Sequence, residues 1–221
     1  MYSSAYLKPF LISFWLTKRH NNKLMADQAL PAVLENILAT ESEPDAVFSA
    51  LLPALGEVLQ CDRCFLYLRN PPTRIGMIPF CWRRSEQYPD VTDSDWKEEP
   101  ESLPNEDPLF AAALHTKPSI FVEDVETASP EVVNRDFEEK NFGHRALVHA
   151  HLCQDGLLWG ILQPCVFDQP RLWTDFDRFA IAQIEKKITP LAVAYVKAAG
   201  SEGKSSNLKY CWNQPINSDF W

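Results

Sequence analysis

Glycine is scarce in this sequence, at 7 of 221 residues. The few glycines form no Gly-rich loop of the Walker or dinucleotide-binding type, which is the pattern that holds nucleotide phosphates. The sequence also lacks a Gly-x-Ser-x-Gly elbow, the sharp turn that presents a nucleophilic serine in α/β-hydrolases. With neither pattern present, we expect a protein that is not an enzyme of these classes.

Positive charge is in deficit as well, because 21 Lys and Arg stand against 30 Asp and Glu, for a formal net charge of -9. This balance argues against a nucleic-acid binder and against adhesion to an anionic membrane. No apolar run reaches the roughly 20 residues of a membrane span, since the apolar stretch 6–16 is interrupted by Lys8 and Pro9. Its basic residues follow the stretch, whereas a secretory signal carries them before it. We therefore expect a cytoplasmic protein without a membrane span.

The six cysteines lie mostly in strand-like apolar runs and not in a small, loop-rich framework of the kind that disulfides stabilise. We interpret them as reduced thiols. Cys61 and Cys64 form a CxxC pair, the spacing of redox motifs and half-zinc sites. No second CxxC follows, and the pair lies between a helix and a strand, so coincidence is favoured over redox function and no metal site is expected.

Hydrophobic spacing predicts two amphipathic helices, at 27–39 and 44–59. A hairpin follows, because the β-rich runs 64–69 and 77–82 are separated by turn residues. Residues 85–107 carry nine acidic side chains and a single lysine, and are predicted to form a long solvated loop.

The second half of the chain alternates helix and strand. Asp107 is the expected N-cap of a short helix, Asp155-Gly156 is a strong hairpin signal, and Thr174 with Asp177 forms a short capping box. The predicted elements are a helix at 108–115, a strand at 119–122, a helix at 130–141, strands at 145–153 and 157–165, and a last helix from 174 that Pro190 bends.

This order suits an α+β fold, in which an antiparallel β-sheet has the terminal helices packed on one face and the middle helices and loops on the other. The length fits one domain with extensions. We place the domain at 25–199. Residues 1–24 are an N-terminal extension, either an upstream or alternative start or a weak interfacial anchor, and 200–221 are a flexible C-terminal tail.

Three segments resemble a known family. Residues 142–146 (FGHRA) and 155–162 (DGLLWGIL) resemble the closing hairpin of phytochrome and cyanobacteriochrome GAF domains, which carry a related "VRA…DGKLWGLL" pattern. Residues 169–173 (QPRLW) resemble the "PRxW" sequence before their last helix. The resemblance covers roughly 27–199 and implies a GAF-like antiparallel sheet flanked by helices.

The same resemblance argues against a covalent chromophore. Those photoreceptors attach a bilin through a Cys, often followed by His, in the helix before the closing hairpin. Here that segment, 129–137, has no cysteine, and Cys165 stands where a bilin-contacting His is common. Covalent bilin is therefore not expected, and the cofactor stays unknown.

The resemblance implies a pocket between the sheet and residues 108–142. His149 and His151 alternate along one strand, so both imidazoles point the same way. They either face the pocket, where a tetrapyrrole, a metal or a proton could bind, or pack against a helix or face solvent. Arg83 either holds a ligand carboxylate or pairs with the acidic loop. The candidate ligand-binding residues are Trp82, Arg83, Phe110, Phe121, Phe142, His149, His151 and Cys165.

Two functions of different class follow. The first is a non-catalytic, stand-alone GAF-type sensory module that binds a small aromatic or tetrapyrrole-like ligand noncovalently and signals through protein association. The alternative is a ligand-free interaction or dimerisation module, whose contact is carried by Pro190, Leu191, Val193, Tyr195 and the apolar stripe of 27–39. A cysteine-based redox enzyme like the free-methionine-sulfoxide reductases is less favoured, because their motifs find no match.

Overall fold

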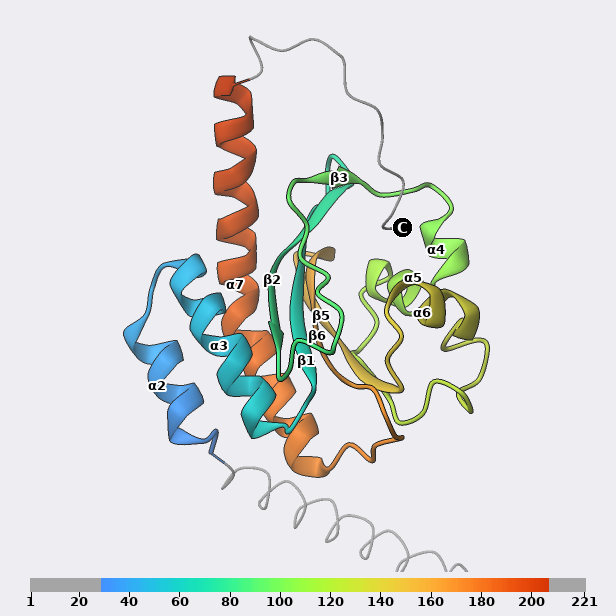
Figure 1. The fold of residues 1–221 in the computed structure, drawn as a ribbon. Helices are drawn as coiled ribbons and strands as arrows, with labels where there is room; N and C mark the ends of the chain where they lie inside the picture. Colours follow the sequence, from blue (N-terminus) through green and yellow to red (C-terminus); the bar gives the residue numbers. More distant parts are fainter. Residues whose placement is uncertain (1–28, 207–221) are drawn as a thin grey trace, which may run out of the picture. The chain divides into compact units, whose positions relative to one another are not determined.

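The centre of the computed structural model, which describes residues 29–206, is a six-stranded antiparallel sheet of order β3-β2-β1-β6-β5-β4 (Figure 1). The strands are β1 (Arg63–Asn70), β2 (Ile75–Arg83), β3 (Lys97–Glu98), β4 (Ile120–Val122), β5 (Ala146–Gln154) and β6 (Leu157–Val166). The helices are α2 (Ala32–Thr40), α3 (Pro44–Val58), α4 (Leu103–Glu106), α5 (Pro108–Leu114), α6 (Arg135–Asn141) and α7 (Asp175–Ser206). The predicted α+β class is confirmed.

The two faces of the sheet carry different helices. The long helices α3 and α7 pack on one face, which we call the helix face, and α2 packs on α3 (Figure 1). The short helices α4, α5 and α6 lie over the opposite face, which we call the cavity face (Figure 1). The expected placement of the terminal helices on one face is therefore confirmed.

Two hairpins supply the four central strands. The β5–β6 turn has Asp155 at φ 55° and Gly156 at φ 73°, and two successive positive φ values are what a two-residue type I′ turn requires. The hairpins join through β1 and β6, where Arg63 pairs with Cys165 and Leu66 with Leu162. Alternate residues of these strands then point to the same face.

Helix starts agree with the predicted caps. The Asp107 side chain accepts hydrogen bonds from the backbone N–H groups of Leu109 and Phe110 at the start of α5. At α7, Thr174 N–H donates to Asp177 (2.8 Å) and Asp177 N–H donates to the Thr174 hydroxyl (3.2 Å), which is a reciprocal capping box.

Two predicted helices are shorter than expected. The helix predicted over 27–39 begins at Ala32, and its first two residues lie outside the described chain. The helix predicted over 130–141 begins only at Arg135, because Asn134 is its N-cap and accepts from Phe137 N–H. The residues before it form a separate turn, in which Val132 and Val133 donate to Ser129 O.

The acidic segment 85–107 is not a wholly solvated loop, so that prediction is wrong. It contains β3 and α4, and Glu99 within it is buried. The Glu99 carboxylate accepts from Tyr67 Oη (2.6 Å) and from Arg69 Nε (2.6 Å) and Nη2 (2.8 Å). Because a buried arginine on β1 neutralises it, this one acid can leave water and fasten the segment to the sheet.

Helix α7 continues to Ser206, so it includes the first seven residues of the segment 200–221 that was predicted to be a tail, and it runs past the sheet (Figure 1). The predicted extension 1–24 and the residues after 206 lie outside the described part of the chain. None of the helices formed by residues 29–206 combines the length and apolar character that a membrane crossing requires.

Candidate functional site

A small cavity of about 40 Å³ lies between the cavity face and helices α4–α6. Its volume leaves room for about three water molecules. Most of its wall is aromatic or aliphatic, and four polar side chains face it from the sheet and the covering helices. The lining residues are Phe65, Tyr67, Ile78, Leu103, Asp107, Phe110, Phe137, Glu138, Phe142, His149, Ile161 and Gln163.

Aromatic rings fill much of the space around the cavity. Phe142, the C-cap residue of α6, stacks on Phe65 at 5.8 Å between ring centroids. Tyr67 meets Phe110 of α5 edge to face at 6.3 Å. Phe142 is only partly buried, so this ring closes the cavity from the side of α6.

Gln163 of β6 is the least satisfied polar residue of the cavity. It is 3% exposed, and its Nε2 finds no hydrogen-bond partner in the described part of the chain. Leaving a buried amide without a partner costs about 1–3 kcal/mol. Such a residue on a cavity wall indicates a site that water or a ligand completes.

Beside the cavity lies a fully buried charged network. Arg63, at 0% exposure, donates to the backbone carbonyls of Pro89 (3.1 Å) and Phe142 (3.3 Å), while its Nε finds no partner among the described residues. His144 Nε2 lies 2.6 Å from Glu138 Oε2. These groups come from β1, α6 and the start of β5, so they join the cavity face to its covering helices.

The charges of this network shift its pKa values. Burial by itself lowers the pKa of His144, but Glu138 and the Cys165 sulfur raise it to about 9. Burial raises the pKa of Cys165, and the charge of Arg63 and a hydrogen bond with His144 outweigh it, so the net shift is downward. The distance of 3.4 Å between Arg63 Nη2 and His144 Nδ1 is long for a hydrogen bond. We therefore infer that the N–H group at His144 Nδ1 donates its hydrogen bond to the Cys165 sulfur.

Asp107 brings a second charge to the cavity wall. Burial, followed by the neighbouring Glu138, raises its pKa to about 7, although the amide groups that it caps oppose the shift. The cavity is thus lined by one acid that titrates near neutrality and one that is paired with His144.

His149 and His151 are bonded to each other. His149 Nδ1 lies 2.9 Å from His151 Nε2, and His151 Nδ1 lies 2.7 Å from the carbonyl oxygen of Lys117. Burial lowers the pKa of both rings, and for His149 the neighbouring His151 and His144 add to the effect. His149 lines the cavity, whereas His151 lines an open cleft of about 370 Å³ beside α7.

Of the eight residues predicted for ligand binding, Phe110, Phe142 and His149 line the cavity. The other five lie elsewhere. Trp82 packs over Gly56 of α3 on the helix face, where a Cβ on residue 56 would come within 2.0 Å of the indole. Strand alternation explains this placement, because Trp82 pairs with Cys64 and points away from the cavity face.

Arg83, Phe121 and Cys165 also stand off the cavity. Arg83 donates to Tyr88 O (2.9 Å) and pairs with Asp90 (3.3 Å) in the acidic segment. Phe121 meets Trp173 edge to face, and Cys165 is fully buried in a separate apolar cluster with Leu147.

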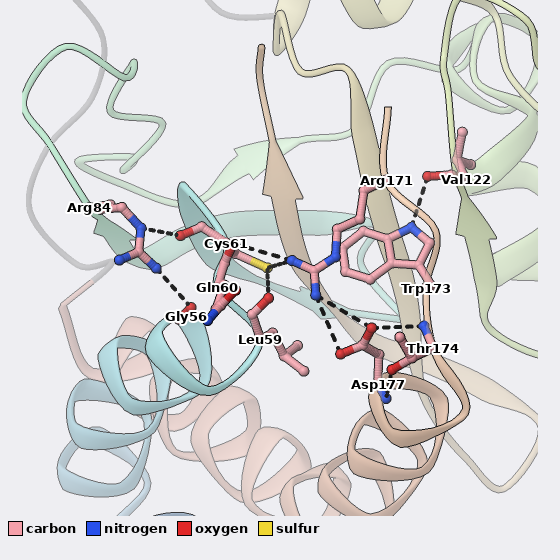
Figure 2. Close-up of polar contacts among 10 residues, drawn as sticks. All are labelled: Gly56, Leu59, Gln60, Cys61, Arg84, Val122, Arg171, Trp173, Thr174 and Asp177. Atoms are coloured by element: carbon pink, nitrogen blue, oxygen red, sulfur yellow. Dashed lines mark hydrogen bonds and ion pairs between the residues drawn. The ribbon is translucent and has the colours of Figure 1, made fainter. Parts of the chain in front are cut away.

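The segment that resembles "PRxW" forms a structural clasp. Figure 2 shows the Arg171 guanidinium between Cys61 and Asp177, with Trp173 beside it. Arg171 donates to Gln60 O (3.2 Å) and to the Asp177 carboxylate (3.4 Å), and Trp173 Nε1 donates to the Val122 carbonyl of β4 (2.9 Å). The clasp joins the end of α3, β4 and the start of α7.

The CxxC pair has no reactive features. Cys61 and Cys64 are buried free thiols, and burial raises the pKa of each. Within residues 29–206, no group of three or more His, Cys, Asp or Glu side chains could hold a metal ion. The coincidental interpretation of this pair therefore fits its surroundings.

A larger hollow of about 600 Å³ beside β4 is less suited to specific binding. It is an open groove whose wall includes Val132 and the exposed Leu172. Its charged groups already have partners, since Arg171 pairs with Asp177 and Asp124 with Arg145. The cavity under α4–α6 is the stronger candidate, because Gln163 Nε2 on its wall has no hydrogen-bond partner among the described residues.

Known structures share this architecture at low sequence identity. The GAF domain of an Acinetobacter phosphoenolpyruvate-protein phosphotransferase matches with a TM-score of 0.56 and 9% identity, over 76% of this chain and 95% of its own. The phycoerythrobilin-bound GAF domain of a cyanobacterial phytochrome gives 0.57 and 16%, over 76% and 96%. The GAF domain of the cyanobacteriochrome TePixJ gives 0.52 and 18%, over 77% and 99%.

None of the curated proteins matches the sequence. The family model described as "GAF domain" matches residues 43–184, which span α3 through the first third of α7 and include every residue of the cavity wall. The chain belongs to the GAF domain family, a family of sensory modules.

Proposed function

We propose that this protein is a non-catalytic sensory module that binds a small molecule in the cavity between the sheet and α4–α6 and signals by protein association. The observation that carries the proposal is Gln163, a buried amide on the cavity wall with an unpartnered Nε2. Aromatic walls with a few fixed polar groups are the usual composition of a ligand pocket. The buried free thiols fit a reducing, cytoplasmic compartment.

The cavity volume favours a ligand smaller than a tetrapyrrole. Pockets for ligands of drug size measure about 300–1,000 Å³, whereas this one measures about 40 Å³. A molecule with a single aromatic ring needs only a displacement of Phe142, which is half-buried and borders the solvent. A tetrapyrrole would require α4, α5 and α6 to move together.

Native mass spectrometry of the protein isolated from its own organism tests this function. We expect a noncovalent mass that is lost on denaturation and that the Gln163→Leu variant fails to retain. Gln183→Leu on α7 is the matched control, because Gln183 lies outside the cavity wall, and it should retain the mass. A bare polypeptide mass in both native and denatured samples would contradict ligand binding.

The ligand-free interaction module remains the second candidate, because stacking of Phe142 on Phe65 fills most of the site. Its predicted contact surface is only partly available. Val193 is buried and Tyr195 packs against Phe48 and Phe80, whereas Pro190 and Val33 are exposed. Light scattering over a wide concentration range tests this candidate, which predicts a dimer mass or a mass that rises with concentration.

A further inference from the structure

The hydrogen bonds of the two β5 histidines have a defined direction. The Lys117 carbonyl can only accept, so His151 Nδ1 must carry the proton in the bond of 2.7 Å between them. A neutral His151 then has a bare Nε2, which accepts from His149 Nδ1 at 2.9 Å. His149 in turn is left with a bare Nε2.

Both rings are held in place for this arrangement. The backbone N–H of His151 donates to the Ser119 hydroxyl at 2.8 Å, and Ser119 donates to Glu185 of α7. Burial lowers the pKa of each ring, so both are neutral near pH 7 and each carries one ring proton. The tautomer of His149 is thus set by the Lys117 carbonyl, which acts through the hydrogen bond between the two rings.

The bare nitrogen belongs to a ring on the cavity wall. No residue in the described part of the chain hydrogen-bonds to His149 Nε2, although the side chain is only 4% exposed. Because the ring lines the cavity, a donor that binds there can supply the hydrogen bond that this nitrogen lacks.

Gln163 stands directly opposite His149. The β5–β6 register pairs Leu147 with Cys165 and Ala150 with Leu162, and the same register sets residue 149 against residue 163. Directly opposed residues of an antiparallel pair have Cβ atoms about 4.5–5.5 Å apart. The cavity therefore contains, side by side, a ring nitrogen that can only accept and an amide without a partner that can donate.

We propose that the cavity selects a neutral, planar molecule with adjacent hydrogen-bond donor and acceptor atoms, such as an N–H azole, which donates to His149 Nε2 and accepts from the Gln163 amide. This inference rests on the proposed ligand-binding function and adds to it the chemical class of the ligand. His151 acts as a positioning residue, because it fixes the proton of His149 without reaching the cavity.

Long-range ¹H–¹⁵N NMR spectra of the full chain test the first step without any ligand. We expect both His149 and His151 to be protonated on Nδ1 and bare on Nε2. In His151→Phe, His149 should become a mixture of tautomers, whereas His115→Gln, at the exposed C-cap residue of α5, should leave the His149 signals unchanged. A His149 ring protonated on Nε2 in the unchanged protein would overturn the inference.

Pyrazole and 1-methylpyrazole test the second step, because they differ only in the N–H donor. We expect pyrazole to bind at least about tenfold more tightly, since the methylated ring leaves a buried acceptor unpaired. His149→Phe should remove this difference, and Gln163→Leu should weaken pyrazole binding. Equal affinities for the two azoles, or binding of neither, would overturn the inference, whereas the native mass measurement decides separately whether the protein binds a ligand.

Discussion

The helix face and the cavity face of the same sheet differ in the polarity of the side chains that they bury. Under α3 and α7 the interior is apolar, with Leu51, Phe48 and Ile184 buried and the Phe48 ring against Phe80. Over the other face, Arg63, Glu138, His144, His149 and Gln163 are buried as deeply, and some of their polar atoms lack partners. The first face stabilises the fold, whereas the second leaves buried polar atoms unpaired at a cost in stability.

The largest effect should come from removing the charge of Arg63. We expect Arg63→Met to lower the free energy of unfolding by about 2–6 kcal/mol, because the carbonyls of Pro89 and Phe142 lose the donor that reaches each of them. Urea denaturation measures the change. Arg84→Met is the matched control on the surface, where the ion pair with Glu57 is partly exposed and contributes no more than about 1 kcal/mol. Equal losses in the two variants would contradict a difference between the faces.

Shortening a side chain should have different effects on the two faces, with a loss of stability alone on the helix face and a change in ligand binding as well on the cavity face. Leu55→Ala on the helix face should cost about 2–5 kcal/mol, because it leaves an empty apolar cavity. Phe142→Leu should cost about 1 kcal/mol, the size of the aromatic contacts that it loses. It should also strengthen pyrazole binding by opening the site. Urea denaturation and azole titration on both variants give the comparison, and a Phe142→Leu protein that binds azole more weakly would contradict it.

The pH dependence of stability should arise on the cavity face. The pKa of His144 rises from 6.5 to about 9 on folding, so the folded state holds its proton more tightly. This contribution, about 3 kcal/mol at most, is complete below pH 6.5 and is lost as the pH rises through 9. The pKa of Asp107 is also raised on folding, to about 7, so this group likewise makes the folded state less stable as the pH rises, but at lower pH.

Urea denaturation between pH 6 and pH 9 should therefore show stability falling with pH. Glu138→Gln should flatten the fall, because the carboxylate that raises the pKa of His144 is gone. A stability that rises across this range in the unchanged protein would contradict the ionised His144–Glu138 pair.

The smallest effect should come from the cap of α7. Thr174→Ala removes the hydroxyl that accepts from Asp177 N–H and should cost about 1 kcal/mol. Thr174→Ser keeps the hydroxyl and should cost less. Thermal unfolding of the pair measures the difference, and azole binding should be the same in both.

Features made by neighbouring residues were predictable from sequence. The Asp107 cap, the Asp155-Gly156 turn and the Thr174–Asp177 box each depend on contacts within three residues of the chain. Strand alternation also placed His149 and His151 on one face, and the two rings are bonded to each other. It could not say which face of the sheet Trp82 would join.

The charged partners of the site were not predictable, because they are distant in sequence. Arg63 reaches a carbonyl 79 residues away, and Arg69 pairs with Glu99 30 residues away. Glu99 was one acid among nine in its segment, with nothing local to mark it as buried. Gln163 did carry a signal, since it is a lone polar residue in a strand whose other positions from Leu158 to Val166 are apolar or glycine.

The Arg171 clasp fixes one end of α7, so a change in the angle of this helix is largest at its other end. The fixed end is the capped first turn of the helix. Arg171 joins its Asp177 to the end of α3, and Trp173 beside it bonds to β4. A helix of 32 residues has a length of about 48 Å. A tilt of about five degrees at the clasp would move the far end of a helix of this length by about 4 Å. A change of angle that barely moves the clasp would thus displace the far end of α7 by more than the length of a hydrogen bond.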